Sequence, residues 1–333
     1  MAKILVTGAA GYIGSHLCLK LLKENFKIIG LDNFSTGFLE PVEILKNKFS
    51  NFEFINLDLA DEEKLSEIFE KNEIKSVIHL AAKIDVAESV QKPSLYLKEN
   101  YENSVKLINK AVEFGISKII SSSTAAVYGN PVYTPIDEKH PTNPLSPYGQ
   151  TKLDFEKYLE KIKNLNYVIF RYFNVGGSDS NGLIGKSHLK SNDLIENIIK
   201  TILGQKPEFQ IFGSDYQTKD GTSVRDLIHV EDVANAHFLA LQEMEKHKLN
   251  TVYNLGSESG YTVLEILGQA EKIAGKNIPV KKQPRRDGDI AVSVATSQKA
   301  KNELNWEISP KNLEKIITTD LNWRKKHPLG YTK

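Results

Sequence analysis

A tyrosine and a lysine four residues apart, Tyr148 and Lys152, are the strongest candidates for chemistry in this 333-residue chain. Pro147 precedes them, which suits the first turn of a helix, and the spacing places both side chains on one helix face. A free phenol has a pKa near 10, so a base that works near pH 7 needs that pKa lowered. A lysine ammonium one turn away acts in that direction. The pair therefore predicts proton transfer to or from a hydroxyl group.

Three glycines, Gly8, Gly11 and Gly14, stand between an apolar run at residues 3–7 and a helical pattern at residues 13–24. Such glycines permit a tight turn and let the backbone approach a pyrophosphate, which then lies at the positive end of the helix. Because a strand precedes the loop and a helix follows it, the arrangement predicts a dinucleotide-binding site.

Acidic residues end the next two predicted strands. Asp32 closes the run 27–32, where its carboxylate can accept both hydroxyls of a ribose and would repel the extra phosphate of NADP. This position favours NAD as the cofactor. Asp58 closes the run 52–58 and can accept a bond from the adenine amine, or alternatively can cap the helix that follows.

Hydroxyl side chains follow a further apolar run at residues 118–122. Ser122, Ser123 and Thr124 come at its carboxyl end, where doubly wound folds bind ligands. One of them could hold the substrate hydroxyl that Tyr148 deprotonates.

The elements that must position these residues alternate between buried strands and helices. The predicted strands are 3–7, 27–32, 52–58, 76–80, 118–122 and 167–172, and the predicted helices are 13–24, 62–70, 93–114 and 148–162. This alternation indicates an α/β fold, a doubly wound parallel sheet of the Rossmann type.

The pattern becomes less regular after about residue 174, with a loop at 176–182 and a helix near 193–203. We therefore expect an NAD-binding domain at 1–175 and a smaller mixed α/β substrate-binding lobe at 176–333. A helix at 230–241 and a strand at 252–255 resemble the first half, so residues 227–256 could return to the first sheet.

Composition excludes several classes of function. The formal net charge of +1 gives no electrostatic case for a nucleic-acid or membrane partner. No apolar run approaches the roughly 18 residues of a membrane helix, and no signal-peptide pattern opens the chain, so we expect a cytoplasmic protein. The single cysteine, Cys18, excludes an intrachain disulfide and a multi-cysteine metal site.

Several motifs together resemble the extended short-chain dehydrogenases/reductases. These are GxxGxxG at 8–14, SSSTAAVYG at 121–129, SPYGQTK at 146–152 and RYFN at 171–174. Three more narrow the resemblance to the UDP-glucose 4-epimerases: GTSVRDLIHV at 221–230, YNLG at 253–256 and RRDGD at 285–289. The similarity runs from residue 1 to about residue 331.

The resemblance implies a role for particular residues. The implied catalytic residues are Tyr148, Lys152 and Thr124. The implied NAD-binding residues are Gly8, Gly11, Tyr12, Ile13, Gly14, Asp32, Asn33, Asp58, Leu59, Leu80, Ala81, Ala82, Asn100, Ser122, Tyr148, Lys152 and Tyr172. The implied residues for the UDP-sugar are Ser123, Thr124, Asn174, Asp193, Leu194, Phe212, Arg225, Arg286, Asp289 and Ser293.

The resemblance also implies a reaction and an assembly. Tyr148 takes the proton of the sugar 4-hydroxyl while a hydride passes to NAD, whose positive charge further lowers the tyrosine pKa. The 4-keto sugar turns over, and the hydride returns to its opposite face. Helices near 93–114 and 148–162 resemble those through which such enzymes form a homodimer by a four-helix bundle.

Some positions depart from the family pattern. Lys83 stands one place earlier than the usual lysine, and Glu99 replaces a common Asn. Asp193 also replaces a common Asn near the diphosphate, where a carboxylate is unfavourable unless it faces away or bonds sugar hydroxyls. Leu227 stands where the family commonly has a tyrosine, so one possible polar contact is lost. Ser293 is small where a bulky tyrosine blocks N-acetylated sugars, so we expect UDP-GlcNAc and UDP-GalNAc to be accepted as well.

Particular residues distinguish this chain from proteins with other functions. Nucleotide-sugar 4,6-dehydratases carry Thr-Asp-Glu where this chain has Thr124, Ala125 and Ala126, so dehydration lacks its acid pair. Sugar-acid 4-epimerases and decarboxylases share most of the motifs and stay open as alternatives. A catalytically silent NAD-binding protein would be expected to lack the Tyr/Lys pair. The histidines His79, His229 and His237 show no metal-ligand spacing and are expected to be structural.

Overall fold

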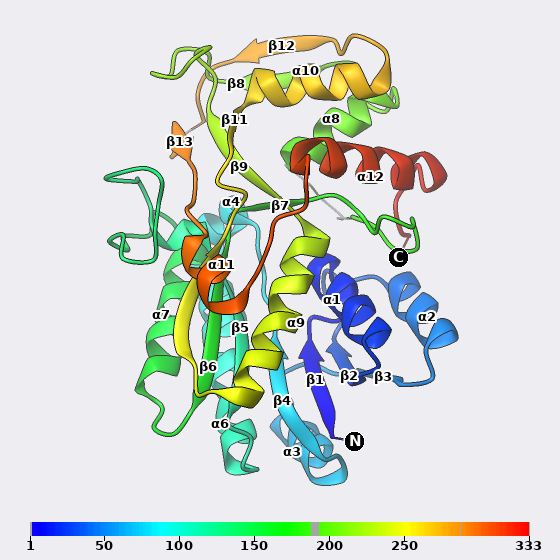
Figure 1. The fold of residues 1–333 in the computed structure, drawn as a ribbon, viewed down its shortest axis with the longest axis vertical. Helices are drawn as coiled ribbons and strands as arrows, with labels where there is room; N and C mark the ends of the chain where they lie inside the picture. The colour runs from blue at the N-terminus through cyan, green and yellow to red at the C-terminus, as the bar shows by residue number, and fades with distance from the viewer. Residues whose placement is uncertain (1, 188–192, 287, 333) are drawn as a thin grey trace.

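The computed structural model describes residues 2–187, 193–286 and 288–332. Its central sheet has seven parallel strands in the order β10-β6-β5-β4-β1-β2-β3 (Figure 1). They are β1 Lys3–Thr7, β2 Lys27–Asp32, β3 Phe52–Asn56, β4 Ile74–His79, β5 Lys118–Thr124, β6 Asn166–Tyr172 and β10 Asn250–Leu255. The predicted doubly wound parallel sheet is confirmed, and its order reverses between β1 and β4, where such sheets bind ligands.

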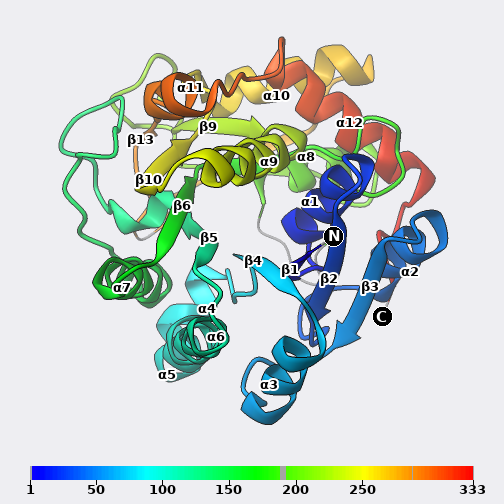
Figure 2. The same cartoon turned by 60° about the horizontal axis from the view of Figure 1, so that its bottom comes forward.

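Helices cover both faces of this sheet (Figure 2). One face carries α1 Tyr12–Lys23, α2 Leu39–Lys48 and α9 Val230–Lys246, and the other carries α3 Glu62–Lys71, α6 Asn103–Glu113 and α7 Pro147–Lys161. Side chains alternate along each strand. In β1, Ile4 and Val6 belong to the first core and Leu5 to the second. Both cores are apolar, which explains why the strands read as continuous hydrophobic runs.

The predicted helix at 93–114 is interrupted. A short helix, α5 Pro93–Tyr96, leads into a π-helical segment, η1 Leu97–Glu102, before α6 begins. Within η1, buried Asn100 bonds the backbone of Lys83 twice, accepting from its N–H at 2.8 Å and donating to its carbonyl at 2.9 Å. Ser104 donates to the Asn100 carbonyl at 2.8 Å. Periodicity could not reveal this irregular turn, because these side-chain bonds stabilise it.

The remaining elements form a second lobe (Figure 1, top). Its four-stranded sheet is built around β9 Val224–His229 and contains β7 Asn174–Gly176, β11 Gly260–Thr262 and β13 Val292–Ser293. Strands β8 Phe209–Phe212 and β12 Val280–Gln283 pair separately. Helices α8 Leu194–Ile202, α10 Val263–Ala274 and α12 Asn312–Lys326 share one apolar core with these sheets.

Two later segments join the first sheet and its core. Strand β10 pairs with β6, and helix α11 Gln298–Leu304 packs beside it. Trp306, which follows α11, is fully buried and donates to the carbonyl of Asp232 in α9 at 2.9 Å. The lobes are therefore linked by several crossings of the chain.

No helix among the described residues is long and apolar enough to cross a membrane.

Candidate active site

The glycine loop joins β1 to α1 at the carboxyl edge of the sheet. Gly8 has a φ of +72°, and a Cβ there would lie 2.8 Å from the Ala81 nitrogen. A Cβ on Gly14 would lie 1.9 Å from the Gly8 carbonyl oxygen. Gly11 precedes α1 without a capping side chain, so its first turn offers backbone N–H groups to an anion. The loop thus fits a dinucleotide pyrophosphate.

Asp32 ends β2 beside this loop. Its carboxylate accepts hydrogen bonds from the backbone N–H groups of Ala10, at 3.1 Å, and Phe34, at 2.8 Å. The first bond fixes the carboxylate against the glycine loop, where a ribose attached to the pyrophosphate would lie.

Asp58 follows β3 and is linked to β2. It accepts from the Asn33 side chain at 2.7 Å and from the Ala60 N–H at 2.9 Å. The residue that caps α3 is Asp61, which accepts from the Lys64 N–H. The alternative of a helix-capping role for Asp58 is therefore wrong. Leu59, beside it, is buried.

Residues 80–82 form the opposite wall of the loop. The Thr7 hydroxyl accepts from the backbone N–H groups of Leu80, at 3.2 Å, and Ala81, at 3.3 Å. The same hydroxyl lies 2.8 Å from His79 Nδ1, and His79 Nε2 lies 2.8 Å from the Ser104 hydroxyl. Burial lowers the pKa of His79 to about 3, so its ring is a neutral structural link.

Tyr148 and Thr124 meet at the carboxyl end of β5. Ser146 accepts from the Gly149 N–H and starts α7, which holds Tyr148 in its first turn. The Tyr148 ring packs edge-on to Tyr96 with 6.4 Å between centroids. Burial raises the pKa of Tyr148, and the hydrogen bond from Thr124 opposes that shift.

Lys152 lies one turn further along α7 and is fully buried behind the tyrosine. Its ammonium donates to the Ser122 carbonyl at 2.9 Å and lies 3.3 Å from the Ser122 hydroxyl. Burial lowers the pKa of Lys152 to about 8, against an opposing effect of Glu156. Burial thus sets the direction of the Tyr148 pKa shift, and the side chain that opposes it is Thr124.

Two residues of the predicted site point elsewhere. Ser123 alternates to the other side of β5 and donates to Glu156, which is paired with Arg171 in a buried cluster. The hydrogen of its hydroxyl is therefore already used in this cluster. The Tyr172 hydroxyl lies 2.8 Å from His237 Nε2, so its polar atom already has a partner within the protein.

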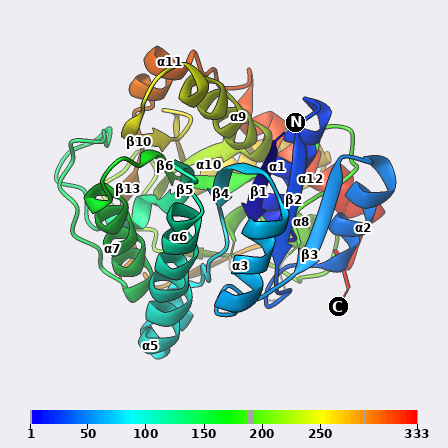
Figure 3. The same cartoon turned by 90° about the horizontal axis from the view of Figure 1, so that it is seen from below.

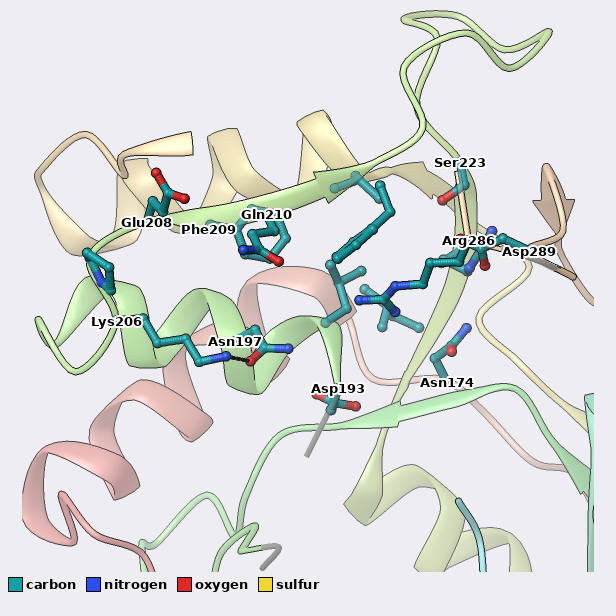
Figure 4. A pocket seen from close by; sticks show the side chains of 16 residues that line it. Asn174, Asp193, Asn197, Lys206, Glu208, Phe209, Gln210, Ser223, Arg286 and Asp289 are labelled. Atoms are coloured by element: carbon teal, nitrogen blue, oxygen red, sulfur yellow. Dashed lines mark hydrogen bonds and ion pairs between the residues drawn. The ribbon is translucent and has the colours of Figure 1, made fainter. Parts of the chain in front are cut away.

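A cavity of about 600 Å³ opens in the second lobe (Figure 4). Its lining contains seven of the residues predicted for the UDP-sugar: Asn174, Asp193, Leu194, Phe212, Arg225, Arg286 and Asp289. It also contains Asn197, Lys206, Pro207, Glu208, Phe209, Gln210, Ser223, Leu227 and Val263. Apart from Leu227, these additional residues carry no distinguishing signal in the sequence, because the fold brings them to the cavity from separate segments.

The two arginines are held in different ways. Arg225 is 2.9 Å from Asp289 and donates to the Ile290 carbonyl at 2.7 Å. Arg286 stacks on the Phe212 ring at 3.7 Å from its centroid. A guanidinium can bond two oxygens of a phosphate at once, so this end of the cavity suits a diphosphate.

The cavity is joined to Tyr148 through β6. Thr124 is paired in register with Tyr172, and Asn174 follows two residues later in the cavity lining. The Asn174 side chain donates to the Asp226 carbonyl at 3.0 Å. Ser293, half-buried in β13, is in register with Arg225 but lies outside the lining.

The remaining histidines have structural partners. His229 caps α9, accepting from the Glu231 N–H, and its other ring nitrogen lies 3.0 Å from the Thr319 hydroxyl. His237 is bonded to Tyr172, as above. Within the described ranges, no cluster of three or more His, Cys, Asp or Glu side chains could hold a metal ion.

Residues 4–256 match the NAD dependent epimerase/dehydratase family. The chain belongs to this family. A UDP-glucose 4-epimerase of Halalkalibacterium halodurans is 42% identical over 332 residues, covering 99% of this chain and 97% of that protein. The resemblance drawn from the sequence motifs is confirmed.

Solved members of the family share the whole fold. The UDP-glucose 4-epimerase of Stenotrophomonas maltophila, with bound NAD and formylated UDP-arabinopyranose, has a TM-score of 0.95 and 35% identity, covering 98% of this chain and 99% of that one. That of Bifidobacterium longum, in complex with NAD+ and UDP, has a TM-score of 0.93 and 36% identity, with 99% and 100% covered.

Proposed function

We propose that this chain catalyses the NAD-dependent epimerisation of UDP-hexoses at C4, interconverting UDP-glucose and UDP-galactose. The observation that carries this proposal is that Tyr148 and Thr124 lie at the carboxyl end of β5, on the same sheet edge as the glycine loop, in a chain whose second lobe holds the arginine-lined cavity. The relatives with this fold are UDP-glucose 4-epimerases, two of them solved with NAD.

Each protein group has a task in this reaction. Tyr148 takes the proton of the 4-hydroxyl and later returns it, Thr124 holds the reacting oxygen, and Lys152 bonds the cofactor ribose. NAD, when bound, would supply the acceptor for the hydride of C4 and a positive charge beside Tyr148. That charge is needed, because burial alone raises the pKa of Tyr148.

The cofactor would lie along the carboxyl edge of the first sheet. We assign its pyrophosphate to the loop 8–14, a ribose to Asp32 and the adenine to the side of Asn33 and Asp58. Its nicotinamide end would lie beside residues 80–82, next to Lys83, whose backbone is fixed by Asn100. Residues 1–175 thus hold the cofactor and 176–333 the UDP-sugar, apart from the segment that returns to the first sheet.

The UDP group would fill the second-lobe cavity. Arg225 and Arg286 bond the diphosphate, Phe212 and Leu194 pack on the uracil, and Asp289 accepts ribose hydroxyls. The UDP group supplies the binding energy that holds the substrate, so the sugar ring itself needs few contacts. The 4-keto ring is therefore free to turn over, as epimerisation requires.

A panel of four substrates tests the proposal: UDP-galactose, UDP-GalNAc, UDP-glucuronate and UDP-xylose. Conversion of UDP-galactose to UDP-glucose without added reductant is expected. Turnover of UDP-glucuronate or UDP-xylose alone would instead support the sugar-acid 4-epimerase or decarboxylase alternative.

Ser293 favours a wider substrate range that includes UDP-GlcNAc and UDP-GalNAc. It is small and half-buried beside Arg225, so an acetamido group has room next to the diphosphate. Ser293→Tyr should abolish turnover of UDP-GalNAc and spare UDP-galactose. Inactivity of the parent on UDP-GalNAc would contradict this extension.

A homodimer through a four-helix bundle fits the outer surface of α6 and α7, which lie side by side (Figure 3). Leu97, in η1 just before α6, and Val112, in α6, expose 43% and 40% of their surface. Sedimentation should show a dimer that Leu97→Asp with Val112→Asp dissociates. Leu329→Asp, at an 84% exposed residue near the C-terminus, is the control. A cytoplasmic location remains a prediction.

A further inference from the structure

An acidic residue lines the cavity proposed for the diphosphate, and a buried cation is paired with it. Asp193 uses one carboxylate oxygen to accept from the Glu196 N–H at 3.0 Å, which caps α8. Its other oxygen lies 2.8 Å from the Lys186 ammonium. The Asp193 side chain is 28% exposed and the Lys186 side chain 3% exposed. The carboxylate therefore reaches the cavity, and the ammonium lies behind it.

Lys186 remains charged in this buried position. Burial opposes its charge, but Asp193 and Asp320 outweigh that effect and raise the pKa of Lys186. The ammonium also donates to the Val175 carbonyl at 3.1 Å and lies 5.0 Å from the centroid of the Tyr12 ring, at the start of α1. It therefore sits between the cofactor helix and the wall of the substrate cavity.

The charges of the side chains that line the cavity show why the Lys186–Asp193 pair matters for ligand binding. The described lining residues include three cationic side chains and three anionic ones: Arg225, Arg286, Lys206, Asp193, Glu208 and Asp289. The formal charges of this set cancel, so the attraction of the two arginines for a diphosphate is opposed by the lining carboxylates. Lys186 adds one positive charge directly behind the carboxylate that would otherwise repel the ligand.

We propose that Lys186 is a positioning residue for nucleotide-sugar binding, which holds and neutralises Asp193 so that this wall can face a diphosphate. The proposal rests on the proposed function, because it assumes that a nucleoside diphosphate occupies the cavity. It also explains how an aspartate is tolerated at position 193. The carboxylate is neither turned away nor unpaired, since its charge is balanced from behind.

The test is the binding of UDP and of uridine, which lacks phosphates, measured by calorimetry on the NAD-containing protein. Lys186→Met keeps the length of the side chain but removes its charge. We expect it to weaken UDP binding about tenfold or more and to leave uridine within about twofold, because only the phosphates meet the exposed carboxylate. In the double variant with Asp193→Asn, UDP binding should return to within about threefold of the parent.

Asp193→Asn alone gives an independent check should Lys186→Met fail to fold, because asparagine caps helices as well as aspartate does. It frees the Lys186 charge and should bind UDP at least as tightly as the parent. Equal loss of UDP and uridine in Lys186→Met, no recovery in the double variant, or weaker UDP binding by Asp193→Asn would each overturn the inference. A parent protein that binds no UDP would instead refute the proposed function.

Discussion

The Thr124 side chain, at the end of β5, lies within interaction range of the Tyr148 phenol, in the first turn of α7, and lowers its pKa against the larger effect of burial. Thr124 is itself fixed, because its oxygen accepts from the Ala126 N–H at 3.2 Å. The phenol therefore lies at the carboxyl end of β5, on the sheet edge that also carries the glycine loop. This relationship makes proton transfer by Tyr148 the step on which the function depends.

Tyr148→Phe should abolish epimerisation while the protein keeps its fold and its ligands. The variant loses the proton-transferring oxygen, and removal of such a group costs about 10²–10⁴-fold in rate. We expect kcat to fall by about that factor, with UDP affinity measured by calorimetry within about threefold of the parent. A variant that retained a tenth of the parent kcat would exclude Tyr148 as the acid/base.

Gly14→Ala should eliminate NAD binding, because its Cβ would overlap the Gly8 carbonyl oxygen. The matched control is Gly268→Ala within α10, where an added Cβ meets nothing within 4 Å. That change should stabilise the protein by about 0.5–1 kcal/mol, since alanine is the better helix former. NAD content after purification and thermal unfolding measure the two effects. Full NAD content in Gly14→Ala would contradict the loop assignment.

Lys152 should make the stability of the cofactor-free protein depend on pH. Its pKa is about 8 in the folded state and 10.5 ordinarily, so the unfolded chain binds more protons between these values. Stability relative to Lys152→Met should therefore rise with pH above 8, by about 1.4 kcal/mol per pH unit, and be flat below 8. Denaturant unfolding of both proteins at several pH values checks this. A constant difference would mean that the lysine keeps its ordinary pKa.

Arg286→Met should weaken UDP binding more than Arg285→Met, the same change at the neighbouring residue. Arg286 stacks on Phe212 inside the cavity, whereas Arg285 pairs with the exposed Asp215 at 2.8 Å and lies outside the lining. A charge-assisted bond to phosphate is worth about 1.5–3 kcal/mol, which corresponds to a loss of about 10- to 100-fold. Arg285→Met should bind UDP like the parent. Equal losses in both variants would argue against a specific diphosphate contact.

The sequence allowed the first sheet and its site to be predicted well, for physical reasons. Strands buried on both faces read as unbroken apolar runs, and β1 and β2 have the predicted bounds. Helix α2 was missed because Pro41, in its first turn, obscures the helical pattern. The interruption at Leu97–Glu102 was missed because it depends on the side-chain bonds of Asn100.

The candidate site was predictable where backbone geometry dictates residue type. Glycines that tolerate no Cβ, and a Tyr/Lys pair on one helix turn, are local signals. Contacts between distant segments were not. The alternation of β5 sends Ser123 into the cluster with Glu156 and Arg171, and Lys186 meets Asp193 only through the fold.

In the proposed reaction the redox step is transient, because the hydride is removed from C4 and returned to the same carbon. The most direct measurement follows UDP-galactose carrying deuterium at C4 by NMR and mass spectrometry. We predict UDP-glucose that keeps the deuterium at C4, with no net NADH formed. Loss of the label to solvent, or accumulation of NADH with an oxidised sugar, would contradict the account.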